Sequence, residues 1–363
     1  MNKSYCSIGL MSGTSGDGVD ASIITTDGEN QYQVIIDRYF EYNREIYENI
    51  HNLKDKIANS VEKLKKFSKE LRLLEEKITL FHADVVKDLL KETNKKIDFI
   101  GFHGQTILHS PSYRITKQLG NGKLLSKLTK KKVVYNFRKN DLINDGQGAP
   151  LAPIFHKLIV EIKKIKLPIT ILNLGGIANI TSISSKNNFS SSDIGPGNCL
   201  IDMWIRNNSK LFYDKDGNLA QTGEINKKIL HNSLENFYKS KINEKKSFDI
   251  KDFDISFFKE LSLENGAATI TEFTAEICAK KIKNNNIYVC GGGRKNKFLI
   301  KSIEKKIKNK IKLIDELDLD GDFIESQAFG YLAIRSYLKL PISFPETTGC
   351  KMPCTGGEVV KSF

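Results

Sequence analysis

The sequence predicts an α/β protein made of two similar halves. A short apolar strand, a glycine turn and a second apolar strand open the chain, and the same arrangement restarts near Leu167. Strand-length apolar runs alternate with helix-spaced apolar positions in both halves, which is typical of layered α/β folds. The chain has 363 residues, 40% of them hydrophobic, and this length can bury two cores. We therefore expect domains at residues 1–167 and 168–363, with largely parallel sheets.

The first half begins as a strand meander and continues with amphipathic helices. The fourth predicted strand, residues 99–102, ends in a polar loop. Pro150 and Pro153 mark the start of the helix that closes this half, since proline is favoured in the first turn of a helix. The expected ranges are strands over 5–10, 21–25, 32–40 and 99–102, a strand at "KKVVYNF", helices within 45–94 and a helix in "APLAPIFHKLIVEIKKI".

The second half repeats the order of strand, turn and strand before its helices. "ITILNLGGIANITSIS" contains the two strands with their glycine turn, and "NIYVCGGG" is a later strand that also ends in glycines. The other expected elements are helices over 200–207, 266–283, 297–308 and 325–338 and a strand over 311–314.

Composition limits the classes of function. The formal charge is +13, but most of the 56 basic residues are lysines scattered through the chain, so nucleic acid is not expected as the main partner. The six cysteines are dispersed, which indicates reduced thiols rather than a disulfide framework. No run of 18 apolar residues and no charged leader with an apolar core occur, so a soluble cytoplasmic protein without membrane contact is expected.

The first glycine turn, in "LMSGTSGDGVDAS", has the composition of an anion site. Gly13, Gly16 and Gly18 allow backbone N–H groups to approach a phosphate closely, and Thr14 and Ser15 add hydroxyl donors. Asp17 and Asp20 are candidate ligands for the Mg²⁺ that accompanies a nucleotide. A glycine hairpin without a ligand is an equal alternative for this turn alone. The spacing matches neither G-x4-G-K-[ST] nor G-x-G-x-x-G, which disfavours P-loop and Rossmann proteins.

Three further loops follow strands in the second half. A second phosphate turn is predicted in "NLGGIANIT", an adenosine site against bare backbone in "VCGGGRKN", and a carboxylate, Asp193, on a Gly-Pro-Gly turn in "SDIGPGN". Each of them alone is equally well explained as a plain turn, but four such loops at strand ends favour a nucleotide site. The candidate residues of the two glycine loops are Gly175, Gly176, Asn179, Gly291, Gly292 and Gly293.

Polar residues at the ends of two first-half strands form a candidate small-molecule site. "FHGQT" supplies His103, Gln105 and Thr106, and "FRKNDLINDGQGAPL" supplies Arg138, Asp141, Asp145 and Gln147. These types suit a polyhydroxylated or carboxylated ligand, with Arg138 favouring a carboxylate. A satisfied loop histidine is the alternative for His103, and capping is the alternative for Asp141 and Asp145. Glu325, at the start of the last helix, either faces a ligand or caps its own helix.

Together and in this order, the motifs resemble those of the anhydro-N-acetylmuramic acid kinases. The resemblance rests on "GLMSGTSGDGVDAS", "FHGQT", "FRKNDLINDGQGAPL", "NLGGIANIT", "SDIGPGNCLID", "VCGGGRKN" and "ESQAFGYLA", from Ile8 to about Ala333. It implies two duplicated actin-like ATPase (ribonuclease H-like) domains that flank a central cleft. It also implies ATP and Mg²⁺ as cofactors, and a homodimer.

The resemblance assigns roles to individual residues. Gly13–Asp20, which includes Val19, would be the ATP phosphate loop, and Asp193 the general base that activates water. The implied reaction opens the 1,6-anhydro ring of 1,6-anhydro-N-acetylmuramic acid and phosphorylates O6, in cell-wall recycling. Gly16 stands where the family often has a bulkier residue, and Ile194 where threonine is common. Met11 lies where related kinases carry an acid, so the metal role falls to Asp17, Asp20 or water.

Two alternatives follow from the same residues. The first is an ordinary sugar or acetate-type kinase of the same fold, in which Asp193 deprotonates a substrate hydroxyl. The second is an ATP-dependent binding or chaperone-like module, in which Asp193 has no catalytic role. The Lys- and Asn-rich region 226–254 does not align with the family motifs.

Overall fold

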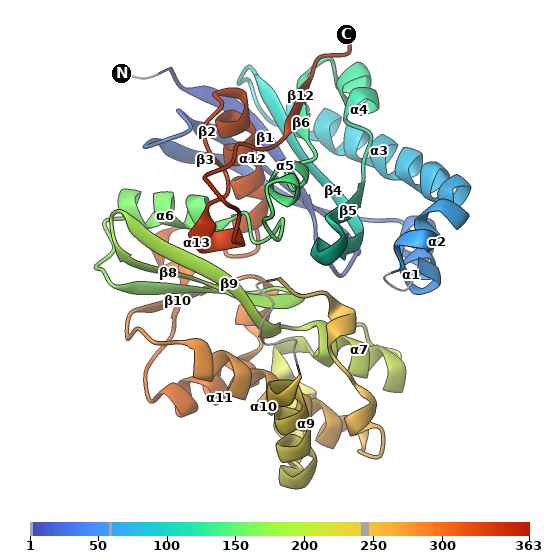
Figure 1. Cartoon of the computed structure of the whole chain (residues 1–363), viewed down its shortest axis with the longest axis vertical. Helices are drawn as coiled ribbons and strands as arrows, with labels where there is room; N and C mark the ends of the chain where they lie inside the picture. The colour runs from blue at the N-terminus through green and yellow to red at the C-terminus, as the bar shows by residue number, and fades with distance from the viewer. Residues whose placement is uncertain (1–2, 58–59, 241–246) are drawn as a thin grey trace. The chain divides into compact units, whose positions relative to one another are not determined.

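The chain forms two compact α/β units. The computed structural model describes residues 3–57, 60–240 and 247–363. One unit comprises Met1–Ile165 with Phe323–Phe363, and the other comprises Lys166–Asp322 (Figure 1). The second unit is therefore continuous in sequence, whereas the first is assembled from two segments.

The first unit is a seven-stranded mixed sheet with helices on it. Its strands are β1 (Tyr5–Ser12), β2 (Gly18–Thr26), β3 (Tyr32–Glu41), β4 (Phe99–Ser110), β5 (Ile115–Leu119), β6 (Lys132–Tyr135) and β12 (Glu358–Val360). Its helices are α1 (Arg44–Ile57), α2 (Val61–Lys66), α3 (Ser68–Lys91), α4 (Gly122–Thr129), α5 (Lys139–Ile143), α6 (Pro153–Ile162), α12 (Ile324–Tyr337) and α13 (Pro345–Thr348).

The strand order of this sheet is β3-β2-β1-β4-β6-β12, with β5 paired to β4. The meander β1–β3 is antiparallel, whereas β1, β4 and β6 run parallel. The parallel register aligns Ser12 of β1 with Gln105 of β4. The first glycine turn and the "FHGQT" motif are therefore neighbours across the sheet.

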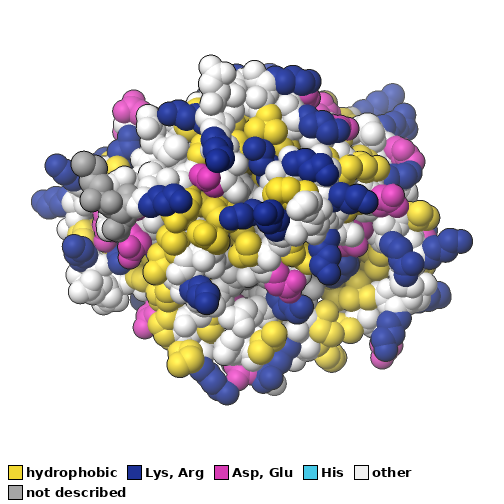
Figure 2. All heavy atoms as spheres, turned by 90° about the horizontal axis from the view of Figure 1, so that it is seen from above, with side chains coloured by type: hydrophobic (Ala, Val, Ile, Leu, Met, Phe, Trp, Pro, Cys, Tyr) yellow, Lys and Arg dark blue, Asp and Glu magenta, His cyan; other side chains and the backbone are white. Residues whose placement is uncertain are grey.

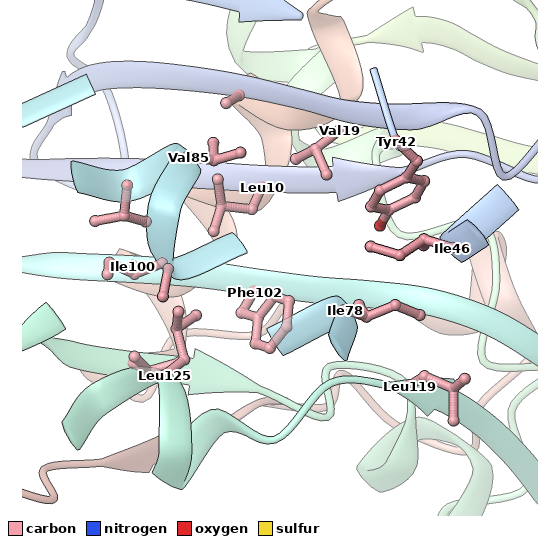
Figure 3. Close-up of a cluster of buried hydrophobic side chains, with 14 of the residues drawn as sticks. Leu10, Val19, Tyr42, Ile46, Ile78, Val85, Ile100, Phe102, Leu119 and Leu125 are labelled. Atoms are coloured by element: carbon pink, nitrogen blue, oxygen red, sulfur yellow. The ribbon is translucent and has the colours of Figure 1, made fainter. Parts of the chain in front are cut away.

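Strand alternation gives this sheet two different faces. Ile8, Leu10, Ile100 and Phe102 pack into the core that includes side chains of α1 and α3, such as Ile46 and Ile78 (Figure 3). On the opposite face of β1 and β4, small residues allow the backbone of α12 to approach the strands. A Cβ atom on Gly9 would lie 1.8 Å from the Ser326 carbonyl oxygen. Helix α12 therefore packs directly on the strand backbones.

The second unit repeats the same topology with five strands. Its elements are β7 (Ile169–Leu174), β8 (Ile177–Ser185), β9 (Asn188–Pro196), α7 (Cys199–Asn208), α8 (Asn218–Thr222), α9 (Lys227–Lys239), α10 (Leu263–Lys281), β10 (Ile287–Cys290), α11 (Lys297–Ile307) and β11 (Lys312–Leu313). The order β9-β8-β7-β10-β11, with an antiparallel meander and a parallel β7-β10-β11 half, matches β3-β2-β1-β4-β6 of the first unit. The predicted repetition of half-chains is confirmed.

Two cores stabilise the second unit. One lies between its sheet and helices α10 and α11, and includes Leu172, Val289 and Leu299. The other is rich in aromatic residues and joins α7, α9 and α10 to the segment around residues 248–258. Trp204 packs in this second core, and its indole N–H donates to the Leu263 carbonyl at 2.8 Å.

The structure corrects several expectations from the sequence. Residues 323–363 belong with the first unit, because α12 packs on β1, β2 and β4. The sheets are mixed rather than largely parallel, since each keeps its antiparallel meander. His103, Gln105 and Thr106 lie within β4, which pairs with β5 as far as Ser110, and not in a loop.

Two further observations concern cysteines and membranes. All six cysteines are buried free thiols, as their spacing predicts. Within residues 3–57, 60–240 and 247–363, no helix combines the length and the hydropathy that crossing a membrane requires.

Candidate active site

The first glycine turn joins β1 to β2 and is held from two sides. The Gly16 N–H donates to the Gly13 carbonyl at 3.2 Å, which closes a four-residue turn, and Gly16 has a φ of 65°. The Lys54 ammonium of α1 donates to the Thr14 carbonyl at 2.8 Å, and the Ser15 hydroxyl donates to Asp17 at 2.6 Å. The turn thus carries hydroxyl groups and a neighbouring cation, which suits an anion.

A buried hydrogen-bond chain supports the start of this turn. His82 Nδ1 is 2.8 Å from the Ile78 carbonyl oxygen, so Nδ1 carries the proton, and Nε2 is the acceptor 3.3 Å from the Ser12 hydroxyl. Ser12 therefore donates to His82, and the Tyr42 hydroxyl must donate to Ser12 at 2.8 Å. Burial lowers the pKa of His82 to about 4, which keeps the ring neutral. The chain fixes the last residue of β1 beneath the turn.

Gln105 connects the "FHGQT" motif to the first glycine turn. Its Nε2 donates to the Gly13 carbonyl at 3.0 Å, which fixes the orientation of the amide. The amide oxygen Oε1 is then buried without a hydrogen-bond partner. An orphaned acceptor of this kind is costly unless a ligand donor reaches it. The neighbouring Thr106 hydroxyl accepts from Gln118 at 3.3 Å.

His103 of β4 and Arg138, which precedes α5, are in direct contact. The His103 Nδ1–H donates to the Gly104 carbonyl at 2.7 Å, and Nε2 accepts from two Arg138 nitrogens at 3.2 and 3.0 Å. Arg138 also donates to the Gly148 carbonyl at 2.8 Å. Burial, reinforced by the Arg138 charge, lowers the pKa of His103 well below its ordinary value. A neutral His103 thus orients the guanidinium.

The Asp141 carboxylate accepts hydrogen bonds from other groups of the first unit. Its Oδ2 accepts from the Gly148 N–H at 2.6 Å, and its Oδ1 accepts from the Thr348 hydroxyl at 2.6 Å. These bonds join α5 to the loop that follows it and to α13; they do not cap α5, whose N-cap residue is Arg138. Asp145 pairs with Arg114 and, at 2.5 Å, with Lys351, and the Lys351 hydrogen bond lowers the pKa of Asp145. Gln147 and Glu325 are half-buried.

Three histidines with lowered pKa values make the stability of the protein pH-dependent. Burial lowers the pKa of His82 and His156 to about 4 and that of His109 to about 3, against an ordinary 6.5. The unfolded chain therefore binds these protons first as the pH falls. The stabilisation is complete above pH 6.5 and is lost progressively towards pH 4, by up to about 1.4 kcal/mol per pH unit for each histidine.

We expect urea unfolding to show a free energy that falls between pH 7 and pH 5. The His156→Gln variant should have a smaller slope, because one of the titrating groups is absent. A free energy that stays constant over this range, or a variant with the parent slope, would contradict the prediction.

In the second unit, three of the predicted loops assemble at the ends of β7, β9 and β10. The N–H groups of Gly197 and Cys199 donate to the Gly176 carbonyl at 3.0 and 3.1 Å, and the Asn198 N–H donates to the Gly175 carbonyl at 2.8 Å. A Cβ atom on Gly293 would lie 2.7 Å from Leu174 Cβ. The glycine turn after β7, the Gly-Pro-Gly turn and the "GGGR" loop are therefore in direct contact.

At three loop positions, neither the backbone conformation nor a contact within the protein requires glycine. Gly13, Gly175 and Gly292 do not have positive φ angles, and an added Cβ would meet its nearest atom at 3.6, 3.6 and 3.9 Å. Gly9, by contrast, is required by contact with α12. Glycine at the three loop positions instead leaves the backbone bare for the close approach of a ligand.

Asp193 lies inside β9, not on the turn that the sequence suggests. It is opposite Asn179 of β8, is 9% exposed, and its Oδ2 accepts from the Phe248 N–H at 2.9 Å. Phe248 falls in the region that does not align with the family motifs, of which residues 241–246 lie outside the described residues. Neither Phe248 nor the strand position of Asp193 is visible from the sequence, because the Gly-Pro-Gly signal dominates the local pattern.

Arg294 stabilises the "GGGR" loop by joining it to aspartates of the segment 315–322. Its side chain is 6% exposed and bonds to Asp315 at 2.8 and 2.9 Å, to Asp320 at 3.1 Å and to Asp322. It also donates to the Gly291 carbonyl at 3.3 Å. The fork of N–H donors on one guanidinium suits such a set of acceptors, whereas a lysine ammonium does not.

Removal of the Arg294 guanidinium should destabilise the second unit. We expect Arg294→Met to lower the free energy of unfolding by about 2 kcal/mol, less than for a fully buried pair because the aspartates are partly exposed. Lys295→Met is the matched control, since Lys295 is largely exposed and its loss should change the free energy by less than about 0.5 kcal/mol. Equal effects of the two variants in urea unfolding would refute the role of Arg294.

The structure allows a test of the predicted metal ligands. Among the side chains that it describes, no group of three or more His, Cys, Asp or Glu residues is arranged to hold a metal ion. The carboxylates of Asp17 and Asp20 both raise the pKa of Tyr39, for which burial is the larger cause. Two carboxylates fit Mg²⁺ when water and phosphate oxygens complete its shell.

Two units with one shared strand order, each with a glycine turn between its first two strands, define a duplicated α/β fold. The sequence model of the anhydro-N-acetylmuramic acid kinase family matches residues 5–362. The chain belongs to this family.

Curated relatives support this assignment. The chain is 52% identical to the anhydro-N-acetylmuramic acid kinase of Pelagibacter ubique, over 100% of both chains. It is 38% identical to that of Zymomonas mobilis, over 97% of this chain and 98% of the relative. Among solved structures, component A of (R)-2-hydroxyglutaryl-CoA dehydratase from Acidaminococcus fermentans is similar with a TM-score of 0.48 and 11% identity, over 92% of this chain and 99% of that one.

Proposed function

We propose that the protein is an ATP-dependent kinase of 1,6-anhydro-N-acetylmuramic acid that opens the anhydro ring and phosphorylates O6. Water adds its oxygen to C1 while the C1–O6 bond breaks, and O6 takes the γ-phosphoryl group of ATP. The products are N-acetylmuramic acid 6-phosphate and ADP, as expected in cell-wall recycling and amino-sugar catabolism.

The observation that carries the proposal is the bare backbone at Gly13, Gly175 and Gly292. We assign Gly13–Asp20, with Gly175, Gly176 and Asn179, to the phosphates of ATP, and Gly291–Gly293 to its adenosine. The Lys54 ammonium beside Thr14 and the hydroxyls of Thr14 and Ser15 supply positive charge and donors. Phosphoryl transfer depends mainly on such positioning and charge neutralisation.

Asp193 is the proposed general base. Addition of water across an acetal requires a carboxylate directed at that water, as in inverting glycosidases. Asp193 is buried on a strand, and its hydrogen bond from Phe248 favours the ionised form that accepts a proton. The phosphoryl group that O6 takes stabilises the leaving oxygen, so the proposal needs no second carboxylic acid.

The sugar is assigned to the cluster of polar residues within β4 and to the loop that follows β6. Arg138, which neutral His103 orients, suits the carboxylate of the lactyl group. The buried Oε1 of Gln105 suits a hydroxyl or amide donor. Thr106, Gln147 and Glu325 complete the proposed contacts, and Asp141 takes part by holding the Gly148 N–H.

The remaining parts of the proposal concern partners and location. Mg²⁺ would be held by Asp17 and Asp20 and would neutralise phosphate charge. We propose a cytoplasmic homodimer with no membrane contact. We propose no nucleic-acid partner either, because most of the basic residues are lysines scattered along the chain, and on the face drawn in Figure 2 hydrophobic and other side chains lie between them.

The test is turnover of ATP and 1,6-anhydro-N-acetylmuramic acid in ¹⁸O-labelled water. We expect the label at C1 of the product, with one ADP released for each sugar. Efficient phosphorylation of a free hexose without turnover of the anhydro sugar would identify an ordinary sugar kinase instead. Nucleotide binding without sugar-dependent ADP release would identify a binding module.

A further inference from the structure

A backbone donor from a distant segment contacts the carboxylate of Asp193. The Phe248 N–H donates to Oδ2 at 2.9 Å, and the two residues are only 7% and 9% exposed. Hydrogen bonds to an ionised group are shorter and about twice as strong as neutral ones, and water competes weakly at a buried site. The contact can therefore affect both the orientation and the ionisation of the Asp193 carboxylate.

The segment that carries this donor is anchored by aromatic packing. The ring centroids of Phe248 and Phe253 are 5.5 Å apart, and Phe253 stacks on Phe237 of α9 at 6.2 Å. Phe237 in turn meets Phe273 of α10 at 5.9 Å. Within the segment, the Phe253 N–H donates to the Ile250 carbonyl at 3.2 Å. The position of the Phe248 N–H is thus set by the aromatic core of the second unit.

We propose that the Phe248 N–H is a positioning group for Asp193. It fixes the plane of the carboxylate and stabilises the ionised form that accepts the proton of the attacking water. Phe248 acts only through Asp193 and touches no reacting atom in this scheme. The inference rests on the proposed function, in which Asp193 is the general base.

The direct test removes the donor and keeps the rest of the segment. Phe248→Pro deletes the N–H, whereas Phe248→Leu keeps it together with an apolar side chain. We expect the proline variant to lose about tenfold in kcat, with KM for ATP and for the sugar within about twofold of the parent. The leucine variant keeps the N–H but gives up the ring contact with Phe253, so it should lose no more than about threefold in kcat.

A double-mutant cycle separates positioning from general damage. If the N–H acts through the carboxylate, Phe248→Pro should cost about tenfold in the parent but almost nothing in an Asp193→Asn background. Equal losses in both backgrounds would overturn the inference and leave the proposed function intact. If Asp193→Asn itself keeps full activity, the proposed function fails instead.

A second variant decides the question if the proline variant does not fold. Phe253→Leu leaves every backbone N–H in place but loosens the anchor of Phe248. We expect about a threefold loss of kcat in the parent and none in the Asp193→Asn background. No loss in the parent, or the same loss in both backgrounds, would overturn the inference.

Discussion

Replacing Asp193 by asparagine lowers kcat by at least about 100-fold under the proposed mechanism, while KM for ATP changes little. The asparagine amide has the shape of the carboxylate and can still accept the Phe248 N–H, but it cannot take a proton from water. Loss of a general base typically costs this much. The measurement is steady-state release of ADP in the presence of 1,6-anhydro-N-acetylmuramic acid, with label from ¹⁸O water followed at C1.

Asp214→Asn is the matched control for this substitution. Asp214 is another buried carboxylate of the second unit, and it accepts from the N–H groups of Leu219 and Ala220 at 2.8 and 2.9 Å. Its replacement should lower stability by about 1 kcal/mol and leave kcat unchanged. Loss of activity in both variants would indicate a structural effect, and full activity of Asp193→Asn would remove the general base from the mechanism.

Gly9→Ala lowers the free energy of unfolding by about 3 kcal/mol, because the new methyl group has no space. Its carbon would lie 1.8 Å from the Ser326 carbonyl oxygen and 2.5 Å from the Gly330 nitrogen, so α12 must move off β1. Interiors are closely packed, and both obstructing atoms belong to a helix backbone that cannot rotate away. The midpoint of urea unfolding gives the change.

Gly13→Ala provides the comparison for stability. It lies just beyond the end of β1, and its Cβ would meet its nearest atom, Ser15 Oγ, at 3.6 Å. We expect its unfolding midpoint to match that of the parent. A Gly9→Ala protein as stable as Gly13→Ala would show that α12 does not pack on the strand backbone as described.

Local patterns in the sequence predict most elements of this fold. The helical spacing of apolar residues in 45–94 corresponds to α1, α2 and α3, and the glycine turns follow β1 and β7 as expected. The partner of α12 is not predictable in the same way. Nearly all residues of α12 from Ile324 to Ser336 are buried, so no single apolar stripe indicates the sheet on which it packs.

The candidate site is predicted less completely, for two physical reasons. Polar residues in "FHGQT" suggest a loop, but the Gln105 amide N–H bonds to Gly13 and His103 bonds to Gly104 and Arg138, so β4 can continue through them. Contacts between distant segments are the second reason. Lys54 at Thr14, His82 at Ser12 and Phe248 at Asp193 join positions whose proximity only the tertiary structure creates.

The two-segment construction of the first unit determines the order in which the chain can fold during synthesis. Residues 166–322 emerge from the ribosome as one uninterrupted stretch and can complete their own sheet at once. The N-terminal sheet stays incomplete until α12 has been translated. Until then, the face that contains Gly9 and Gly101 has no helix packed on it. A nascent chain that stalls before residue 324 would thus present a finished second unit beside an N-terminal sheet open to chaperones.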